Sequence, residues 1–213
     1  MSSKTKIVIL VAVLILVIIC DVLLLRYLYG NSLANTSPVE AYDENKYLVH
    51  KKFKNRKEAA NLMAQMHERT ILLMKHLKGK YDNDGVMDEN DDIVRRLTRG
   101  YDVDNIVENS PHNLQGTTSF TQNKGDLMAF CLRSKETHQL HDINTMMFVK
   151  IHELSHIACR ELNHPPKFWE IFAKLLNEAA QVPVIELVDY SKHPVRYCGM
   201  LINHSPYFDY YSG

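Results

Sequence analysis

Apolar side chains recur every three or four residues in three long stretches of the chain, at residues 55–78, 147–157 and 168–180. This spacing places the apolar side chains on one face of a helix. The sequence therefore predicts three amphipathic helices. A shorter helix is expected at residues 91–99, after an acidic loop.

Shorter apolar stretches predict strands at residues 105–108, 117–121 and 127–132. A glycine-containing turn at residues 123–126 separates the last two strands, and this arrangement predicts a β-hairpin. Helices combined with a few short strands indicate an α+β fold whose sheet is short and mostly antiparallel.

An almost uninterrupted aliphatic run covers residues 7–25. It is long enough to cross a lipid bilayer as a helix. Because Lys4 and Lys6 precede the run, we expect the N-terminus on the cytoplasmic side and the rest of the chain on the opposite side. Residues 1–29 are thus predicted to form a single-pass signal anchor, with a cleaved signal peptide as the alternative.

The chain has 213 residues, and its hydrophobic content of 46% is enough for one core even without the aliphatic run. Residues 30–46 contain Gly, Asn, Ser and Pro without periodicity, and we interpret them as a linker. Residues 47–213 are then expected to form one domain.

Basic and acidic residues balance at 25 each, and the part after the aliphatic run is slightly acidic. A domain that binds nucleic acid is usually clearly basic, so nucleic acid is not expected as a partner. A basic stretch at residues 51–57 precedes the first long helix. We interpret it as a solvated helix start, with contact to lipid headgroups or nucleic acid as the alternative.

The second long helix contains the sequence HELSH, in which His152 and His156 lie one turn apart on one face. Two imidazoles in this arrangement can bind one metal ion. His164 follows, just before Pro165 and Pro166, which end the helix and turn the chain so that His164 can come back toward the ion. These residues predict a site for one Zn²⁺ ion; a histidine-rich helix without metal is the alternative.

A catalytic zinc ion has three protein ligands and a fourth position for water, whose pKa it lowers to about 7. Glu153 follows the first ligand and is expected beside that water. Its carboxylate can take a proton as the water attacks a carbonyl carbon, and can later pass the proton to the leaving nitrogen. The motif therefore predicts hydrolysis of peptide bonds.

The run from HELSH through His164 to residues 168–172 resembles the H-E-L-x-H…H…F pattern of the WLM and SprT-like zinc metallopeptidases, in particular the uncharacterised WLM-like proteins of large DNA viruses. Further shared cues are Thr121-Gln122-Asn123-Lys124-Gly125, Cys131-Leu132-Arg133, Asp142-Ile143-Asn144-Thr145 and Tyr197-Cys198-Gly199. The resemblance implies a small zincin-like fold, one zinc ion, the three histidines as ligands, Glu153 as base and peptidase activity. It also indicates a virion or host endomembrane as the location.

By the same resemblance, an edge strand beside the active helix receives the substrate backbone, and a purely structural strand is the alternative. The candidate residues for this strand are Leu127, Met128, Ala129, Phe130, Cys131 and Leu132.

The oxyanion of the transition state needs a hydrogen-bond donor beside it, and the candidates are Tyr190, His193 and Tyr197. The alternative for each of them is a packing or turn role.

Cys131, Cys159 and Cys198 lie in the domain, and their odd number leaves at least one of them unpaired in a monomer. If the domain is exported, Cys131 with Cys198 is one possible bridge. We interpret Cys159 as a core residue.

The sequence therefore predicts a zincin-like α+β domain behind a membrane anchor, which acts as a zinc-dependent peptidase on peptide or protein substrates. A noncatalytic, zinc-stabilised virion membrane protein is one alternative. A protease that acts on DNA-bound proteins is another.

Overall fold

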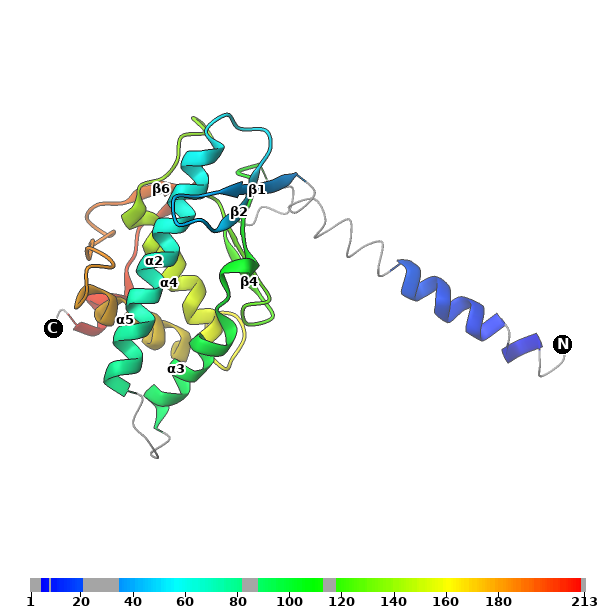
Figure 1. The fold of residues 1–213 in the computed structure, drawn as a ribbon. Coiled ribbons are helices and arrows are strands. Elements are labelled where there is room, and N and C mark those ends of the chain that lie inside the picture. Colours follow the sequence, from blue (N-terminus) through cyan, green and yellow to red (C-terminus); the bar gives the residue numbers. More distant parts are fainter. Residues whose placement is uncertain (1–4, 8, 21–34, 82–87, 113–117, 212–213) are drawn as a thin grey trace.

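The computed structural model of the chain describes residues 5–7, 9–20, 35–81, 88–112 and 118–211. From residue 35 onward these residues form an α+β fold (Figure 1). The strands are β1 (Thr36–Glu40), β2 (Lys46–His50), β3 (Ile106–Glu108), β4 (Phe120–Gln122), β5 (Leu127–Phe130), β6 (Val195–Tyr197) and β7 (Met200–Ile202). The helices are α2 (Arg56–Tyr81), α3 (Glu89–Gly100), the 3-10 helix η1 (Val103–Asn105), α4 (Ile143–Ala158), α5 (Pro166–Ala180) and α6 (Pro206–Tyr211).

The larger sheet has five strands in the order β1-β2-β3-β5-β4, and β6 and β7 form a separate antiparallel pair. The two outer pairs of the larger sheet, β1 with β2 and β4 with β5, are antiparallel, whereas β2 with β3 and β3 with β5 are parallel. The prediction of a mostly antiparallel sheet is therefore wrong for its centre. Helices α2 and α3 lie between β2 and β3 in the chain, and such a crossover returns the chain in its original direction.

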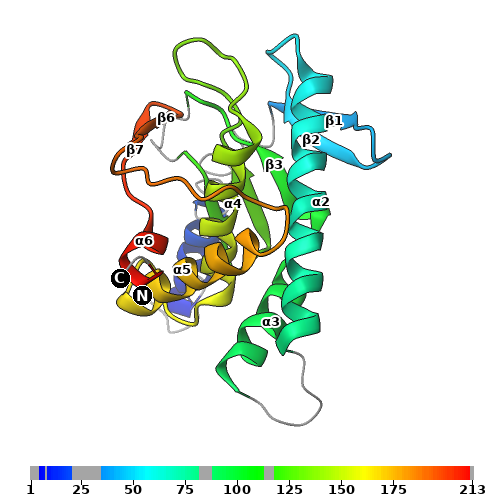
Figure 2. The ribbon, with the colours of Figure 1, turned by 90° about the vertical axis from the view of Figure 1, so that its left-hand side faces the viewer.

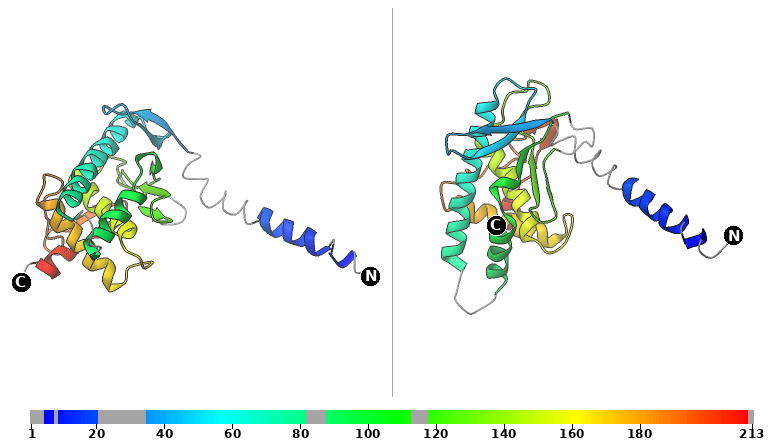
Figure 3. Two further views of the ribbon diagram at one scale, coloured as in Figure 1. Left: turned by 60° about the horizontal axis from the view of Figure 1, so that its bottom comes forward. Right: turned by 45° about the vertical axis from the view of Figure 1, so that its right-hand side comes forward.

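The long helices predicted from apolar spacing are confirmed as α2, α4 and α5, and the shorter one as α3. Helices α2 and α4 pack against each other and against strands of the larger sheet, while α3 contacts both of these helices (Figures 2 and 3). Their shared core contains fully buried side chains, including Met63, Met66, Leu73, Met146, Ile151, Leu154, Phe168 and Phe172. The methionines of α2 thus fill the core.

A buried carboxylate also joins α5 to α2. Glu178 accepts hydrogen bonds from Lys80 Nζ at 2.9 Å and from the Tyr81 hydroxyl at 2.6 Å, and it pairs with His76 Nε2 at 2.8 Å. Burial alone would raise the pKa of Glu178, but these hydrogen bonds hold it below its ordinary value. The far end of α2 is therefore fixed against the helix that follows the histidine motif.

A fully buried ion pair connects the strand ends near the centre of the sheet. Arg133 Nε donates to Glu108 Oε1 at 2.6 Å, and the other carboxylate oxygen of Glu108 accepts from the His50 backbone N–H at 2.7 Å. Both charged side chains are completely buried. The pair thereby holds the segment after β5 against β2 and β3.

A disulfide joins Cys131, just after β5, to Cys198, in the turn between β6 and β7, with 6.2 Å between the Cα atoms. This confirms the bridge considered from the sequence. Cys159 is free and buried, as expected of a core residue. The smaller sheet is thus attached covalently to the larger one.

The N-terminal residues are helical at 5–7 and 9–20, and their aliphatic side chains are exposed, with Leu10 at 72%. Among the described residues, no helix combines the length and the apolar character needed to span a membrane. Part of the predicted span, residue 8 and residues 21–25, lies outside the described residues.

The folded domain begins earlier than expected. Strand β1 occupies part of the stretch 30–46 that we interpret as a linker, and it pairs along its whole length with β2. The linker interpretation is therefore wrong from Thr36 onward, because backbone pairing orders a stretch that shows no apolar periodicity. The earlier linker residues 30–34 lie outside the described part.

Candidate metal centre

The helix that carries the histidine motif has a well-formed start. Asp142 is the N-cap of α4, and its carboxylate accepts from the Thr145 backbone N–H at 2.8 Å and from the Thr145 hydroxyl at 2.7 Å. Aspartate is among the preferred N-cap residues because its oxygen satisfies a free N–H of the first turn. Asn144 in the same turn exchanges two hydrogen bonds with the backbone of Glu186. These contacts fix the orientation of α4.

The structure brings His152, His156 and His164 together. One ring nitrogen from each lies within 4.8 Å of the others, and the Nε2 atoms of His152 and His164 are 3.1 Å apart. Two nitrogen ligands of a tetrahedral zinc ion, each at about 2.0–2.1 Å, are separated by about 3.3 Å. The trio therefore fits a single zinc ion with three protein ligands.

The surroundings of the three rings favour the neutral form that binds metal. Burial, helped by the neighbouring imidazoles, lowers the pKa of His152 to about 3. Burial also lowers the pKa of His156 to about 4, and His164 and Lys124 add to this shift. The pKa of His164 is lowered by burial as well. Phe168 packs against all three rings and contributes to their burial.

Lys124 holds the segment that brings His164 back to α4. Its ammonium donates to the carbonyl oxygens of His156 at 2.8 Å, Cys159 at 2.6 Å and Glu161 at 3.0 Å. The last carbonyl groups of a helix lack partners within the helix, so a lysine in this place both caps α4 and shapes the loop after it. The three donors of the ammonium are all used.

The turn that carries Lys124 is tightly seated. Asn123 and Lys124 both have positive φ, and Gly125 N–H donates to the Gln122 carbonyl at 3.0 Å, which matches the hairpin turn predicted at residues 123–126. Gly125 has φ of +119°, and a Cβ there would lie 1.7 Å from the backbone oxygen of Gly100. Only glycine fits this position against the end of α3.

Glu153 is buried beside the histidines, with 3% of its surface exposed. Burial raises the pKa of its carboxyl to about 7, although a hydrogen bond from Thr121 opposes the shift. The Thr121 hydroxyl donates to Glu153 Oε2 at 2.9 Å. A carboxylate with a pKa near neutrality is suited to taking up and releasing a proton.

Thr121 and Lys124 are site residues that the motif analysis did not assign. Both lie in the stretch 121–125 that carries part of the family resemblance, and this stretch was the available signal. Their partners on α4 and in the loop after it are 32 to 37 residues away in the sequence. No local pattern connects the two segments.

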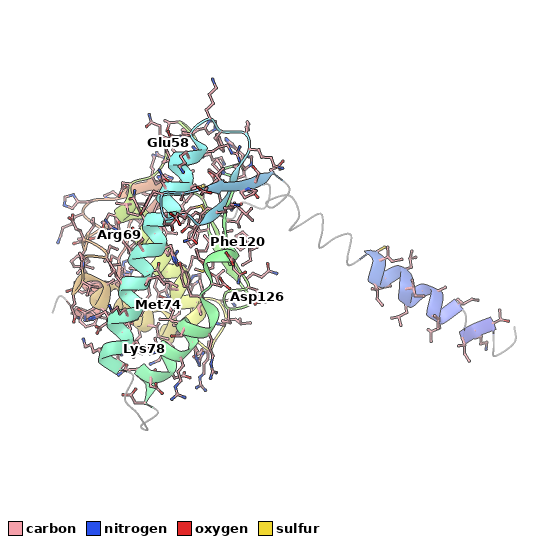
Figure 4. The ribbon with its side chains drawn as sticks, viewed as in Figure 1. Glu58, Arg69, Met74, Lys78, Phe120 and Asp126 are labelled. Atoms are coloured by element: carbon pink, nitrogen blue, oxygen red, sulfur yellow. A yellow bond between two sulfur atoms is a disulfide. The ribbon has the colours of Figure 1, made fainter. Side chains whose placement is uncertain are left out.

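The structure corrects the predicted edge strand. Strand β5 lies between β3 and β4, so Leu127, Met128, Ala129 and Phe130 are inside the sheet, and Cys131 and Leu132 follow its end fully buried. The edge beside α4 is β4, because β5 uses its other side to pair with β3. The labelled side chains of Phe120 and Asp126 mark this hairpin in Figure 4.

A groove of about 430 Å³ runs along the edge of β4. It is lined by residues of β4 and by the histidine cluster, including Phe120, Thr121, Glu153, His156 and His164. An extended chain placed in this groove would lie between the imidazoles and the side of β4 that pairs with no other described strand. The groove thus connects a free strand edge to the candidate metal centre.

The three candidates for oxyanion stabilisation lie in different places. Tyr197 is buried, its hydroxyl contacts the Ser119 hydroxyl, and it shares a pocket with His152 and Glu153. Burial raises the pKa of Tyr197, so the phenol keeps its proton. Tyr190 is buried against the Phe148 ring, and His193 is exposed, and neither lines the pockets around the cluster.

Comparison with known proteins identifies viral relatives. No family model matches the chain. The chain is 32% identical over 189 residues to uncharacterised protein R325 of Acanthamoeba polyphaga mimivirus. The aligned residues cover 89% of this chain and 93% of the viral protein. It is 37% identical over 87 residues to uncharacterised protein 136R of Invertebrate iridescent virus 6, covering 39% of this chain and 47% of that protein.

Among solved structures, Wss1 from Saccharomyces cerevisiae is similar at 20% identity with a TM-score of 0.47, over 63% of this chain and 87% of that one.

Proposed function

We propose that this chain, which belongs to the same family as the uncharacterised mimivirus protein R325, is a zinc-dependent metallopeptidase. One observation carries the proposal: three imidazole nitrogens lie within 4.8 Å of one another, and a buried carboxylate follows the first of these histidines in the sequence. His152, His156 and His164 would hold one zinc ion. Three protein ligands leave the fourth position that hydrolysis requires.

When bound, zinc would supply Lewis acidity and lower the pKa of a coordinated water to about 7. Glu153 would accept the proton of the attacking water and deliver it to the leaving amine nitrogen. Thr121 would orient the Glu153 carboxylate through their 2.9 Å hydrogen bond. Burial of Glu153 keeps its proton affinity high enough for both transfers.

We place the substrate backbone along β4 rather than β5, since β4 has the free edge and lines the groove at the histidine cluster. An extended peptide can add to such an edge through backbone hydrogen bonds. Of the three oxyanion candidates, Tyr197 alone lies in a pocket with His152 and Glu153, and we retain it in that role.

The test is zinc content and peptide cleavage of the full chain in detergent, with Glu153→Gln and the exposed Glu58→Gln as a matched control. We expect about one zinc ion per chain in all three proteins. Cleavage should fall at least a hundredfold in Glu153→Gln only, since positioned acid–base groups typically contribute 10²–10⁴-fold. Glu58 lies at the start of α2 (Figure 4) and lines neither of the pockets that contain the histidines.

Absence of stoichiometric zinc in the wild type would defeat the proposal. Zinc retained without any cleavage would instead favour a noncatalytic, zinc-stabilised membrane protein.

We further propose that residues 7–25 anchor the protein in a virion or host endomembrane, with the domain on the side away from the cytoplasm. The aliphatic run behind Lys4 and Lys6 supports this placement. The Cys131–Cys198 disulfide also supports it, because disulfides persist in oxidising compartments. Membranes washed at alkaline pH should retain the protein, and release into the wash would contradict the anchor.

A further inference from the structure

A second hollow, of about 260 Å³, adjoins the candidate metal centre on the side of the smaller sheet. His152 and Glu153 form one end of it. Its walls come from α4, α5, the β6–β7 hairpin and the residues just before β4. Figure 2 shows the hairpin on the same side of the molecule as α5 and α6. A side chain beside the scissile bond of a bound peptide would therefore enter this hollow.

The walls of this hollow are mostly apolar. Its large apolar side chains are Phe148 of α4, Trp169 and Phe172 of α5, and Met200 and Leu201 of the hairpin. The polar residues Thr118, Ser119, Asn203 and His204 also line it. Apart from Glu153, the described lining contains no Lys, Arg, Asp or Glu. Burying a charged side chain without a partner is costly, so the hollow disfavours acidic and basic residues.

The hairpin wall presents apolar surface that nothing in the described part of the chain covers. Met200 is 48% exposed and Leu201 is 51% exposed, while Tyr197 and Cys198 of the same hairpin are buried. The disulfide at Cys198 fixes this wall to the larger sheet. A bound apolar side chain would remove this surface from water, with a gain of about 25 cal/mol for each Å².

The size of the hollow indicates a large side chain. An apolar cavity of about 150 Å³ is sufficient for a benzene ring. The hollow of about 260 Å³ therefore accommodates phenylalanine, leucine or methionine, whereas alanine would leave most of the space unfilled.

We infer that the protein selects peptides with a large, uncharged apolar side chain, Phe, Leu or Met, directly beside the scissile bond. The inference rests on the proposed peptidase function, since His152 and Glu153 define which bond lies next to the hollow. The hairpin wall, and Leu201 in particular, determines this specificity.

Cleavage specificity gives the first test. The zinc-loaded full chain is incubated with a peptide library, and the cut sites are identified by mass spectrometry. We expect Phe, Leu or Met at one position flanking the cut, with kcat/KM at least tenfold above that of matched Ala peptides, since one methylene in an apolar pocket is worth about tenfold or more. Leu201→Glu should lower cleavage of the Phe peptide at least tenfold.

The matched control for this variant is Leu72→Glu, because Leu72 is 45% exposed on α2 and does not line the hollow. We expect the Leu72→Glu protein to cleave the Phe peptide as fast as the wild type does. Cleavage without apolar preference, or Leu201→Glu acting like the control, would overturn the inference and leave the peptidase function standing.

Binding gives a second test that does not depend on turnover. Trp169 is the sole tryptophan of the chain and lines the hollow, so its fluorescence reports occupancy directly. In the Glu153→Gln protein, a Phe peptide should change the emission at a concentration at least tenfold below that needed for Ala or Asp peptides. The same response to all three peptides would overturn the inference. Selective binding without cleavage by the wild type would instead defeat the peptidase function and retain the apolar site.

Discussion

Thr121 shows how a single hydroxyl outside the histidine motif holds the carboxylate that we propose as the catalytic base. Its hydroxyl donates to Glu153 Oε2 at 2.9 Å from the edge strand β4. The hydrogen bond fixes one oxygen of a carboxylate that has little contact with water. Thr121 is thus a positioning residue for Glu153.

We expect Thr121→Val to lower kcat about five- to tenfold, with zinc content and KM unchanged. A net hydrogen bond is worth about 1 kcal/mol, and 1.36 kcal/mol corresponds to a factor of ten in rate. Steady-state kinetics with metal analysis measures the effect. Thr98→Val, which removes a local hydrogen bond in α3, is the control, and equal kcat in both variants would contradict the assignment.

At the scale of residues, the sequence predicts those parts of the candidate site whose members lie close together in the chain. His152, Glu153 and His156 share one helix turn, so their spacing alone brings them together. Thr121 and Lys124 act on α4 across 32 or more residues, and nothing in their local sequence shows this. Predicting their contacts requires the hairpin to be placed against the helix.

At the scale of elements, the turn between β4 and β5 joins the sheet to the metal-binding helix. One side of it presents Lys124 to the end of α4, and the other packs on Gly100 at the end of α3. Any shift of this turn moves the ammonium that shapes the loop before His164. We therefore expect the backbone fit at Gly125 to be coupled to the proposed zinc binding.

We expect Gly125→Ala to reduce the free energy of unfolding by about 3 kcal/mol or more, because alanine would combine positive φ with a backbone clash. Zinc affinity should fall with it. Gly79→Ala is the matched control, because its Cβ meets nothing within 4 Å and it lies in α2, where alanine favours the helix by about 1 kcal/mol. Denaturant unfolding measures the free energy of unfolding of both variants. Similar unfolding curves for Gly125→Ala and Gly79→Ala would refute the coupling.

The long amphipathic helices are predictable because their apolar spacing repeats over many residues. Strands β1, β2, β6 and β7 are short and give no comparable repeat, so the sequence analysis predicts no strand at any of them. The order of the strands depends on which distant segments pair. For this reason the hairpin is predicted correctly while its edge strand is not.

At the scale of the whole molecule, the Cys131–Cys198 bridge connects two sheets that share no backbone pairing in the described part of the chain. It spans 67 residues, which include both α4 and α5. In the chain-entropy account, a long closed loop removes many conformations from the unfolded state. The bridge therefore stabilises the candidate metal centre and the hairpin wall together.

Replacing both cysteines with alanine should lower the free energy of unfolding by roughly 4 kcal/mol. For a protein of this size, we expect the Tm to fall by about 10 °C. Calorimetry with and without a phosphine reductant measures the change. The reductant should destabilise Cys159→Ala but leave the double variant unaffected, and a reductant effect on the double variant would contradict this account.

The bridge also determines what happens when the chain is cut. The segment from Arg160 to His164 between α4 and α5 is exposed, so it is open to cleavage by a protease, including self-digestion by the proposed peptidase activity. A single nick there, or anywhere else between Cys131 and Cys198, leaves both fragments joined through sulfur. Nicked molecules would keep their full mass on a non-reducing gel and separate into two pieces only after reduction.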